Sequence, residues 1–161
     1  MAAVDYFLKL DGIQGESADA KHKGEIEVLS FSFGETVTVA GGSPRGGGAG
    51  KVQMTDFAFT AGTSKASPVL FQQCAEGRHI KQALLTLRKA GKGQLEYLKI
   101  KLEDILISSY AVAGAESEGI PHDAFSLNFK KISIDYRPQK PDGSLAAAVH
   151  GGWDLSKNVK V

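Results

Sequence analysis

The sequence predicts a mainly β protein: a small β-barrel of two packed, bent antiparallel sheets, with one short flanking α-helix and an extended Gly-rich loop. Apolar and polar residues alternate with a period of two over most segments, as in half-buried strands. In several segments this alternation slips by one residue, which moves the apolar side chains to the other face unless the strand bends or bulges. Bent strands form the corners of barrels. With 161 residues, we expect a single domain spanning 1–161.

The N-terminal segment is the first expected strand, because apolar residues occupy every second position. The Asp11-Gly12 pair then favours a turn. A hydrophilic loop is expected over residues 14–24. The shared apolar face of this strand consists of Val4, Tyr6, Leu8 and Leu10.

Three later segments contain the phase slip and are expected to be long strands that bend. In the first, Ile26 and Val28 are followed by Leu29, Phe31 and Phe33. The others separate Val52 and Met54 from Phe57 and Phe59, and Phe125, Leu127 and Phe129 from Ile132, Ile134 and Tyr136. Further strands are expected at 80–89, 95–101, 104–113 and around 149–155.

One segment, 67–77, lacks the period of two and predicts a short helix. Ser67 fits its N-cap, Pro68 its first position and Gly77 its left-handed end. The expected apolar stripe, which would lie on the barrel, is Leu70, Phe71, Cys74 and Ala75. A reactive thiol needs an electropositive neighbourhood, so we expect Cys74 to be buried and inert.

The charge pattern argues against nucleic acid as a partner, and the lack of a long apolar stretch argues against a membrane. Nineteen basic and eighteen acidic residues are interspersed along the chain, which argues against nucleic acid. The cationic pairs Arg88-Lys89 and Lys130-Lys131 are expected on a solvated face. No apolar stretch approaches the ~20 residues of a membrane helix, so no membrane insertion is expected. The N-terminus lacks a signal-peptide pattern, which predicts synthesis in the cytoplasm and, for a secreted protein, export without a cleaved signal.

The glycine-rich segment 41–51 was tested as a phosphate-binding loop. Counting back from Gly50-Lys51, the position of the first glycine holds Arg45, and Val52 stands where a Ser or Thr is required. A strand rather than a helix is expected to follow, so no helix N-terminus would face an anion. The segment therefore predicts a flexible loop, or an arm that becomes ordered on meeting a neighbour.

Motifs of catalytic or metal chemistry are absent from the sequence: there is no HExxH, paired CxxC or GxSxG. The four histidines, His22, His79, His122 and His150, are scattered and are expected at the surface or in turns. We therefore expect no enzyme, no catalytic residue, no metal and no cofactor.

Two long N-terminal segments, DYFLKLDGIQGES (5–17) and KHKGEIEVLSFSFG (21–34), carry a family resemblance that continues to the end of the chain. Together they resemble the haemolysin-coregulated protein (Hcp) family of the type VI secretion system. Phe31 and Phe33 stand where members often have tryptophan, an exchange that keeps an aromatic core. The further matching segments are 46–52, 77–79, 87–91, 125–129, 135–143 and 152–155.

The resemblance implies a β-barrel subunit that forms a homo-hexameric ring. Rings would stack into a tube, surrounded by a contractile sheath on a baseplate and capped by a valine-glycine repeat (VgrG) spike. Contraction would drive the tube out of the cell, with small secreted effectors in its lumen.

The same resemblance implies a ring-stacking role for the loop at residues 40–51. Its candidate contacts are Gly41, Gly42, Ser43, Pro44, Arg45, Gly46, Gly47, Gly48 and Lys51. Alternation places Ser30 and Ser32 opposite the Leu29, Phe31 and Phe33 face, which makes them candidates to line the lumen. Equally, these serines are expected simply to face solvent or to pair across the sheet. Two other functions remain open: a monomeric β-barrel binding module secreted as an effector, and a small hydrolase with convergent carboxylates.

Overall fold

The structure is a computed structural model that describes residues 4–38, 50–89 and 93–161. Strands dominate it, with one α-helix and one 3-10 turn among the described residues. The elements in chain order are β1 (Val4–Leu10), β2 (Ile26–Ser32), β3 (Glu35–Val37), β4 (Val52–Met54), β5 (Phe57–Gly62), α1 (Ala66–Glu76), β6 (His79–Lys89), β7 (Glu96–Ala113), η1 (Glu116–Glu118), β8 (His122–Asn128), β9 (Lys131–Tyr136), β10 (Val149–Asp154) and β11 (Val159–Lys160).

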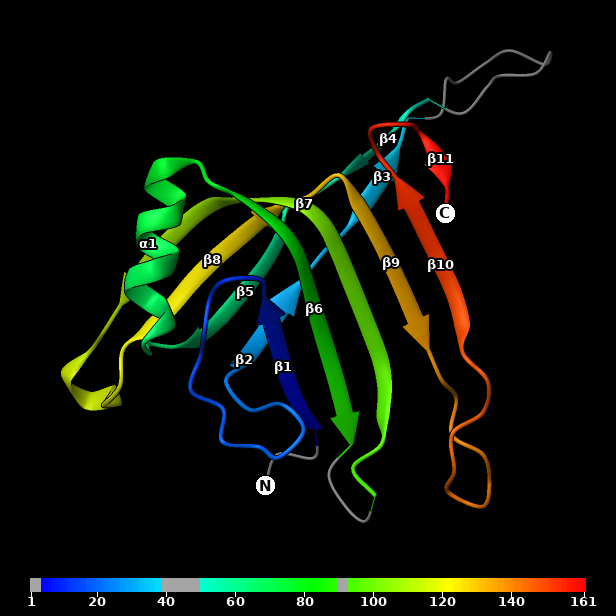
Figure 1. Cartoon of the computed structure of the whole chain (residues 1–161), viewed down its shortest axis with the longest axis horizontal. Helices are drawn as coiled ribbons and strands as arrows, with labels where there is room; N and C mark the ends of the chain where they lie inside the picture. Colours follow the sequence, from blue (N-terminus) through cyan, green and yellow to red (C-terminus); the bar gives the residue numbers. More distant parts are fainter. Residues whose placement is uncertain (1–3, 39–49, 90–92) are drawn as a thin grey trace.

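Six of the strands close into a barrel. Their order is β7-β6-β1-β2-β5-β8, and β8 pairs again with β7, so the sheet returns to its start. Strands β9, β10 and β11 extend this sheet beyond β7, and β3 and β4 form a separate ribbon. Figure 1 shows the barrel with α1 against one side and the β9–β10 extension at the other. The predicted mainly β barrel with one short helix is confirmed.

Aromatic rings fill the barrel beneath β2, β5 and β8. Phe57, Phe59 and Phe125 are at most 2% exposed. The ring centroids of Phe57 and Phe59 lie 4.9 Å apart, and those of Phe59 and Phe125 lie 5.3 Å apart. These are preferred separations for aromatic pairs, so the stack holds these strands in one register.

Strand β7 differs from the sequence prediction. Residues 95–101 and 104–113 were expected as two strands, but one strand of 18 residues runs through both. Asp104, at the expected break, has a φ of 55° and bends the strand without ending it. Before the bend β7 pairs with β9, and after it β7 pairs with β8. One strand therefore serves both the barrel and its extension.

The three phase slips have different structural causes. The first is a bulge in β2 between Val28 and Ser30, where the pairing with β5 shifts. It turns Leu29 outward, 58% exposed, so its predicted place on the Phe31 and Phe33 face is wrong. At the other two slips the chain breaks into separate strands, β4 and β5 and then β8 and β9, rather than bending within one strand.

Helix α1 starts two residues earlier than predicted. It begins at Ala66 with Lys65 as N-cap, so Ser67 lies inside the first turn and is not the cap. The predicted end is confirmed, because Gly77 has a φ of 63° and its N–H bonds to the Cys74 carbonyl. Phe71 is 60% exposed and Ala75 is also exposed, so the predicted stripe is wrong at these two positions.

The loop between β1 and β2 forms a second buried layer on the outer side of the barrel. Arg88 beneath the loop is 3% exposed, so its predicted solvated position is wrong; His22, within the loop, is 7% exposed, so it is not at the surface, although it opens a turn as the alternative expectation had it. His22 stacks on Phe7 with ring centroids 4.4 Å apart, and Arg88 lies 4.8 Å from the same ring. Strand alternation correctly points Arg88 out of the barrel, but it cannot show that the loop, which carries His22, folds over it.

Acidic groups pair with both of these buried side chains. Arg88 bonds to Asp5 and Asp19, and this contact holds the pKa of Asp19 well below its usual range while raising that of Arg88. The two ring nitrogens of His22 lie 2.8 Å from carboxylate oxygens of Glu25 and Glu96. These contacts fix the loop to the sheet, since a buried cation must keep its partners.

Candidate functional site: a face of small polar residues

Four strands, β2, β5, β8 and the second half of β7, present a face made of small side chains. Strand pairing arranges them in two rows that run across the strands. The first row is Ser30, Thr60, Ala124 and Ala111, and the second is Ser32, Ala58, Ser126 and Ser109. None of these side chains carries a charge, and we call them the small-residue face.

Side-chain hydrogen bonds link neighbouring strands across this face. The hydroxyls of Ser30 and Thr60 bond to each other, as do those of Ser109 and Ser126. The Ser108 and Ser126 oxygens lie 2.7 Å apart. Most of the face lines a shallow depression of about 260 Å³. Ser30 and Ser32 therefore lie together as predicted, both exposed, and Ser30 also pairs across the sheet.

Strand alternation produces this face directly. The residues between the two rows point the other way, into the barrel, and all of them are aromatic: Phe31, Phe59, Phe125 and Tyr110. Large rings on the inside and small groups on the outside make the outer surface smooth. At one end of it the Asn128 amide donates to Asp56 across 3.0 Å.

The sequence prediction missed most of the small-residue face. Only Ser30 and Ser32 were named, whereas Ala58, Thr60 and Ser126 lie beside them in the same rows. The signal was available, because each of these residues alternates with a phenylalanine along its strand. Which strands stand next to one another was the missing information.

A buried carboxylate joins helix α1 to this part of the barrel. Asp123 on β8 is 2% exposed and accepts hydrogen bonds from three hydroxyls. Thr63 donates across 2.9 Å and Tyr110 across 3.2 Å, and the Ser67 hydroxyl of α1 is the third donor. Burial, and next the charge of Asp123, raise the pKa of Tyr110. The group acts as an anchor between the helix and the strands.

Other chemistry-bearing side chains are dispersed. Cys74 is half-buried rather than fully buried as predicted. His79 and His150 form exposed pairs with Asp104 and Asp135. Across the residues that the structure describes, no three His, Cys, Asp or Glu side chains gather as a metal site. Within the same residues, no helix has both the length and the apolarity to cross a membrane.

The predicted ring-stacking loop falls mainly outside the described residues. Gly41, Gly42, Ser43, Pro44, Arg45, Gly46, Gly47 and Gly48 are all among 39–49. Lys51 is described, and it lies exposed just before β4.

The closed barrel, its anchored helix and the uncharged small-residue face define a mainly β, closed-barrel protein. Over residues 7–136 the chain matches the family model described as "Type VI secretion system effector, Hcp". It is 41% identical to Protein hcp1 of Pseudomonas aeruginosa over 160 residues, covering 98% of this chain and 99% of that protein.

Comparison with solved structures gives the same family. The crystal structure of Hcp1 from Salmonella typhimurium superposes with a TM-score of 0.82 at 36% identity, covering 99% of this chain and 100% of that one. A type VI secretion system effector from Yersinia pestis gives a TM-score of 0.75 at 36% identity, covering 93% of this chain and 99% of that one. The chain belongs to the Hcp family of secreted type VI secretion system proteins, which are structural and not enzymes.

Proposed function

We propose that this protein is the subunit of the inner tube of a type VI secretion system. Six copies form a ring, and rings stack into a tube whose lumen is lined by the small-residue face. The observation that carries this proposal is the face itself, which extends over four strands with small, uncharged side chains.

The physical demand on a lumen explains the composition of this face. A cargo must be held loosely enough to leave, so strong ion pairs and deep apolar pockets are unsuitable. The eight side chains in its two rows are Ser, Thr and Ala, and their neighbours bond several of the hydroxyls. Repeated around a ring, the face gives a wet, smooth surface past which small secreted effectors travel.

For the remaining parts of the assembly we propose what the family resemblance implies. In this proposal the subunit is made in the cytoplasm without a cleaved signal, and sheath contraction on a baseplate drives the tube out of the cell. A valine-glycine repeat spike caps the tube. The β3–β4 ribbon, which extends away from the barrel in Figure 1, carries the proposed ring-stacking segment, with Arg45 and Lys51 as candidate contacts.

A second candidate function is a monomeric binding module secreted as an effector. It is favoured by an apolar groove of about 610 Å³ between the β3–β4 ribbon and strands β9 and β10. Trp153 lines this groove, and its buried indole N–H has no partner among the described residues. A ligand with a carbonyl group would satisfy that donor.

The mass of the purified protein in solution separates these functions. Light scattering after size exclusion, at micromolar concentration, should give six times the subunit mass. A strict monomer at every concentration would support the binding module instead.

The lumen assignment needs a test of its own. In a Cys74→Ser background, Ser32→Cys is labelled with maleimide-gold and located by electron microscopy. Ala147→Cys, at an exposed position outside the face, is the matched control. Label from position 32 should lie at the ring centre and label from position 147 elsewhere. Position-32 label on the outer rim would refute the assignment.

A further inference from the structure

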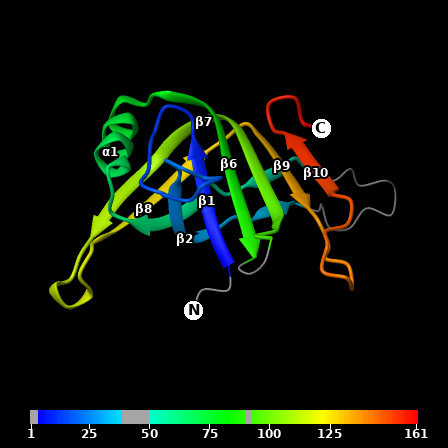
Figure 2. The ribbon, with the colours of Figure 1, turned by 60° about the horizontal axis from the view of Figure 1, so that its bottom comes forward.

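The hairpin between β7 and β8 projects from the barrel as an arm, which we define as residues 111–122. Figure 1 and Figure 2 both show it leaving the body of the molecule. Every residue in this range is exposed, although residues at both ends belong to paired strands. Val112 is 57% and Ile120 is 67% exposed. Exposed apolar groups on a projecting arm favour a partner, because such surface is unfavourable in water.

The arm carries negative charge only. Glu116 and Glu118 form its tip in η1, and residues 105–129 contain no Lys or Arg. Neither glutamate has an ion-pair partner among the described residues. The two carboxylates are therefore free to meet cations on another molecule.

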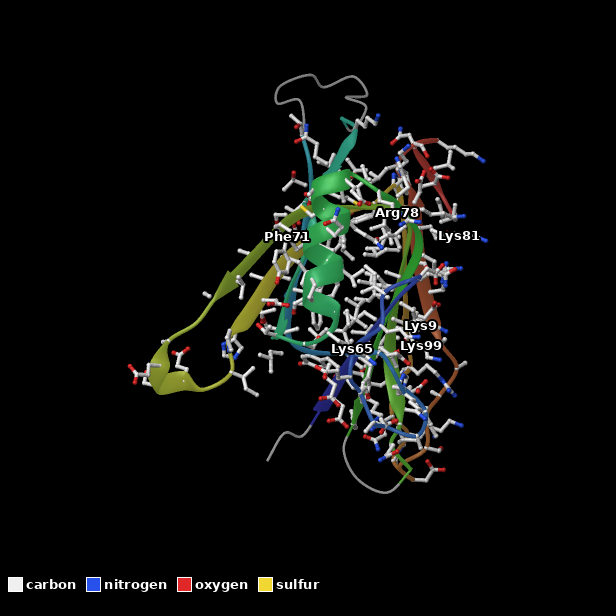
Figure 3. All side chains as sticks on the ribbon, turned by 60° about the vertical axis from the view of Figure 1, so that its left-hand side comes forward. Lys9, Lys65, Phe71, Arg78, Lys81 and Lys99 are labelled. Atoms are coloured by element: carbon white, nitrogen blue, oxygen red, sulfur yellow. The ribbon has the colours of Figure 1, made fainter. Side chains whose placement is uncertain are left out.

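A hollow lined by positively charged side chains lies beneath the β1–β2 loop. Four lysines line it, Lys9, Lys21, Lys23 and Lys65, and none has an ion pair in the described part of the chain. Figure 3 shows Lys9 and Lys65 in the same region, on the side of the barrel next to α1.

The acidic groups of this hollow are mostly engaged. Glu25 bonds to His22, and a Glu16 oxygen accepts the Lys65 backbone N–H across 3.3 Å. Asp11 is the third carboxylate that lines the hollow. Four lysines against these three carboxylates leave one net positive charge on the lining, and none of the four ammonium groups is held in an ion pair among the described residues. The lining is largely polar, unlike the apolar pockets that hold small molecules.

We propose that the acidic arm of one copy docks in this lysine-lined hollow of a neighbouring copy. This contact rests on the proposed tube. A closed ring or a stack repeats head-to-tail contacts, and so needs two unlike, complementary surfaces on each subunit. The arm and the hollow are such a pair: one projects and is acidic, the other is concave and basic. The glutamates meet the lysines, and Ile120 is covered at the contact.

Charge reversal and its repair test the contact. The full chain is prepared as wild type, as E116K/E118K, as K21E/K23E and as the quadruple variant that combines them. All the altered side chains are exposed, so folding, checked by circular dichroism, is expected to be unchanged. K140E/K157E is the matched control, because it reverses two exposed lysines that do not line the hollow.

Sedimentation velocity over a series of protein concentrations resolves monomers, rings and stacked rings together. We expect each double reversal to raise the concentration needed for assembly at least tenfold and the quadruple variant to recover most of it. Higher salt should weaken the wild-type contact. Wild-type assembly that is unchanged by both reversals, or a quadruple variant that recovers nothing, overturns this contact alone. A monomeric wild type instead overturns the proposed tube, and the contact with it.

Discussion

Replacing Asp123 by alanine should release helix α1 from the barrel, because one carboxylate holds three hydroxyls from three parts of the chain. Thr63 precedes the helix, Ser67 lies in its first turn and Tyr110 is on β7. The carboxylate is 2% exposed and Ser67 is 5% exposed, so water cannot replace that hydrogen bond. Thr63 and Tyr110 are half-buried and can turn toward solvent.

The expected magnitude follows from these different exposures. The buried Ser67 hydroxyl still accepts the Ser64 N–H but loses the acceptor of its own proton, at about 2 kcal/mol, and each half-buried hydroxyl loses about 0.5–1 kcal/mol. Asp123→Ala should therefore lower the free energy of unfolding by about 3–4 kcal/mol. Asp123→Asn should lose about half as much, since its amide oxygen still accepts and its NH₂ donates to a hydroxyl oxygen.

Urea unfolding measures this loss as a shift of the midpoint at constant slope. Protein concentration is held fixed, because assembly adds stability by mass action. Ser67→Ala and the double variant complete a cycle, in which we expect about 1–2 kcal/mol of coupling between positions 67 and 123. Hydrogen exchange should rise mainly in α1. A loss under about 1 kcal/mol for Asp123→Ala, or strict additivity in the cycle, would refute the anchor.

Three further changes test the packing and one surface charge pair. Phe57→Ala empties a fully buried site in the aromatic stack, and calorimetry should show a loss of about 3–5 kcal/mol; an unchanged midpoint would contradict the stack. Gly15→Ala places a Cβ 2.5 Å from the Glu25 carbonyl oxygen, so urea unfolding should show a loss of about 1–3 kcal/mol, and wild-type stability would mean that the loop yields freely. The pKa of His150 is raised by Asp135 and then by the Val161 carbonyl. Asp135→Asn should therefore lower the unfolding midpoint most below pH ~6.5, and the difference from wild type should fade as pH rises through the raised pKa. A difference from wild type that grows with pH contradicts this sign.

Local patterns in the sequence were sufficient for several of the strands and for the end of the helix. Alternation located β1 and β6, and Gly77 ends α1 in the left-handed conformation that its lack of Cβ allows. Alternation also placed Ser30 and Ser32 on the outside of β2, opposite Phe31. Each of these features depends on neighbours within a few residues, so one chain is enough to show it.

Contacts between distant segments decided the rest. The small-residue face depends on which strands stand beside β2. Strand pairing brings residue 30 next to residue 60, and residue 58 next to residue 126. Arg88 alternates like a surface residue and is buried only because residues near Asp19 fold over it. Periodicity reports which side of a strand a residue faces; whether solvent or another segment covers that side depends on long-range packing, which the local pattern does not contain.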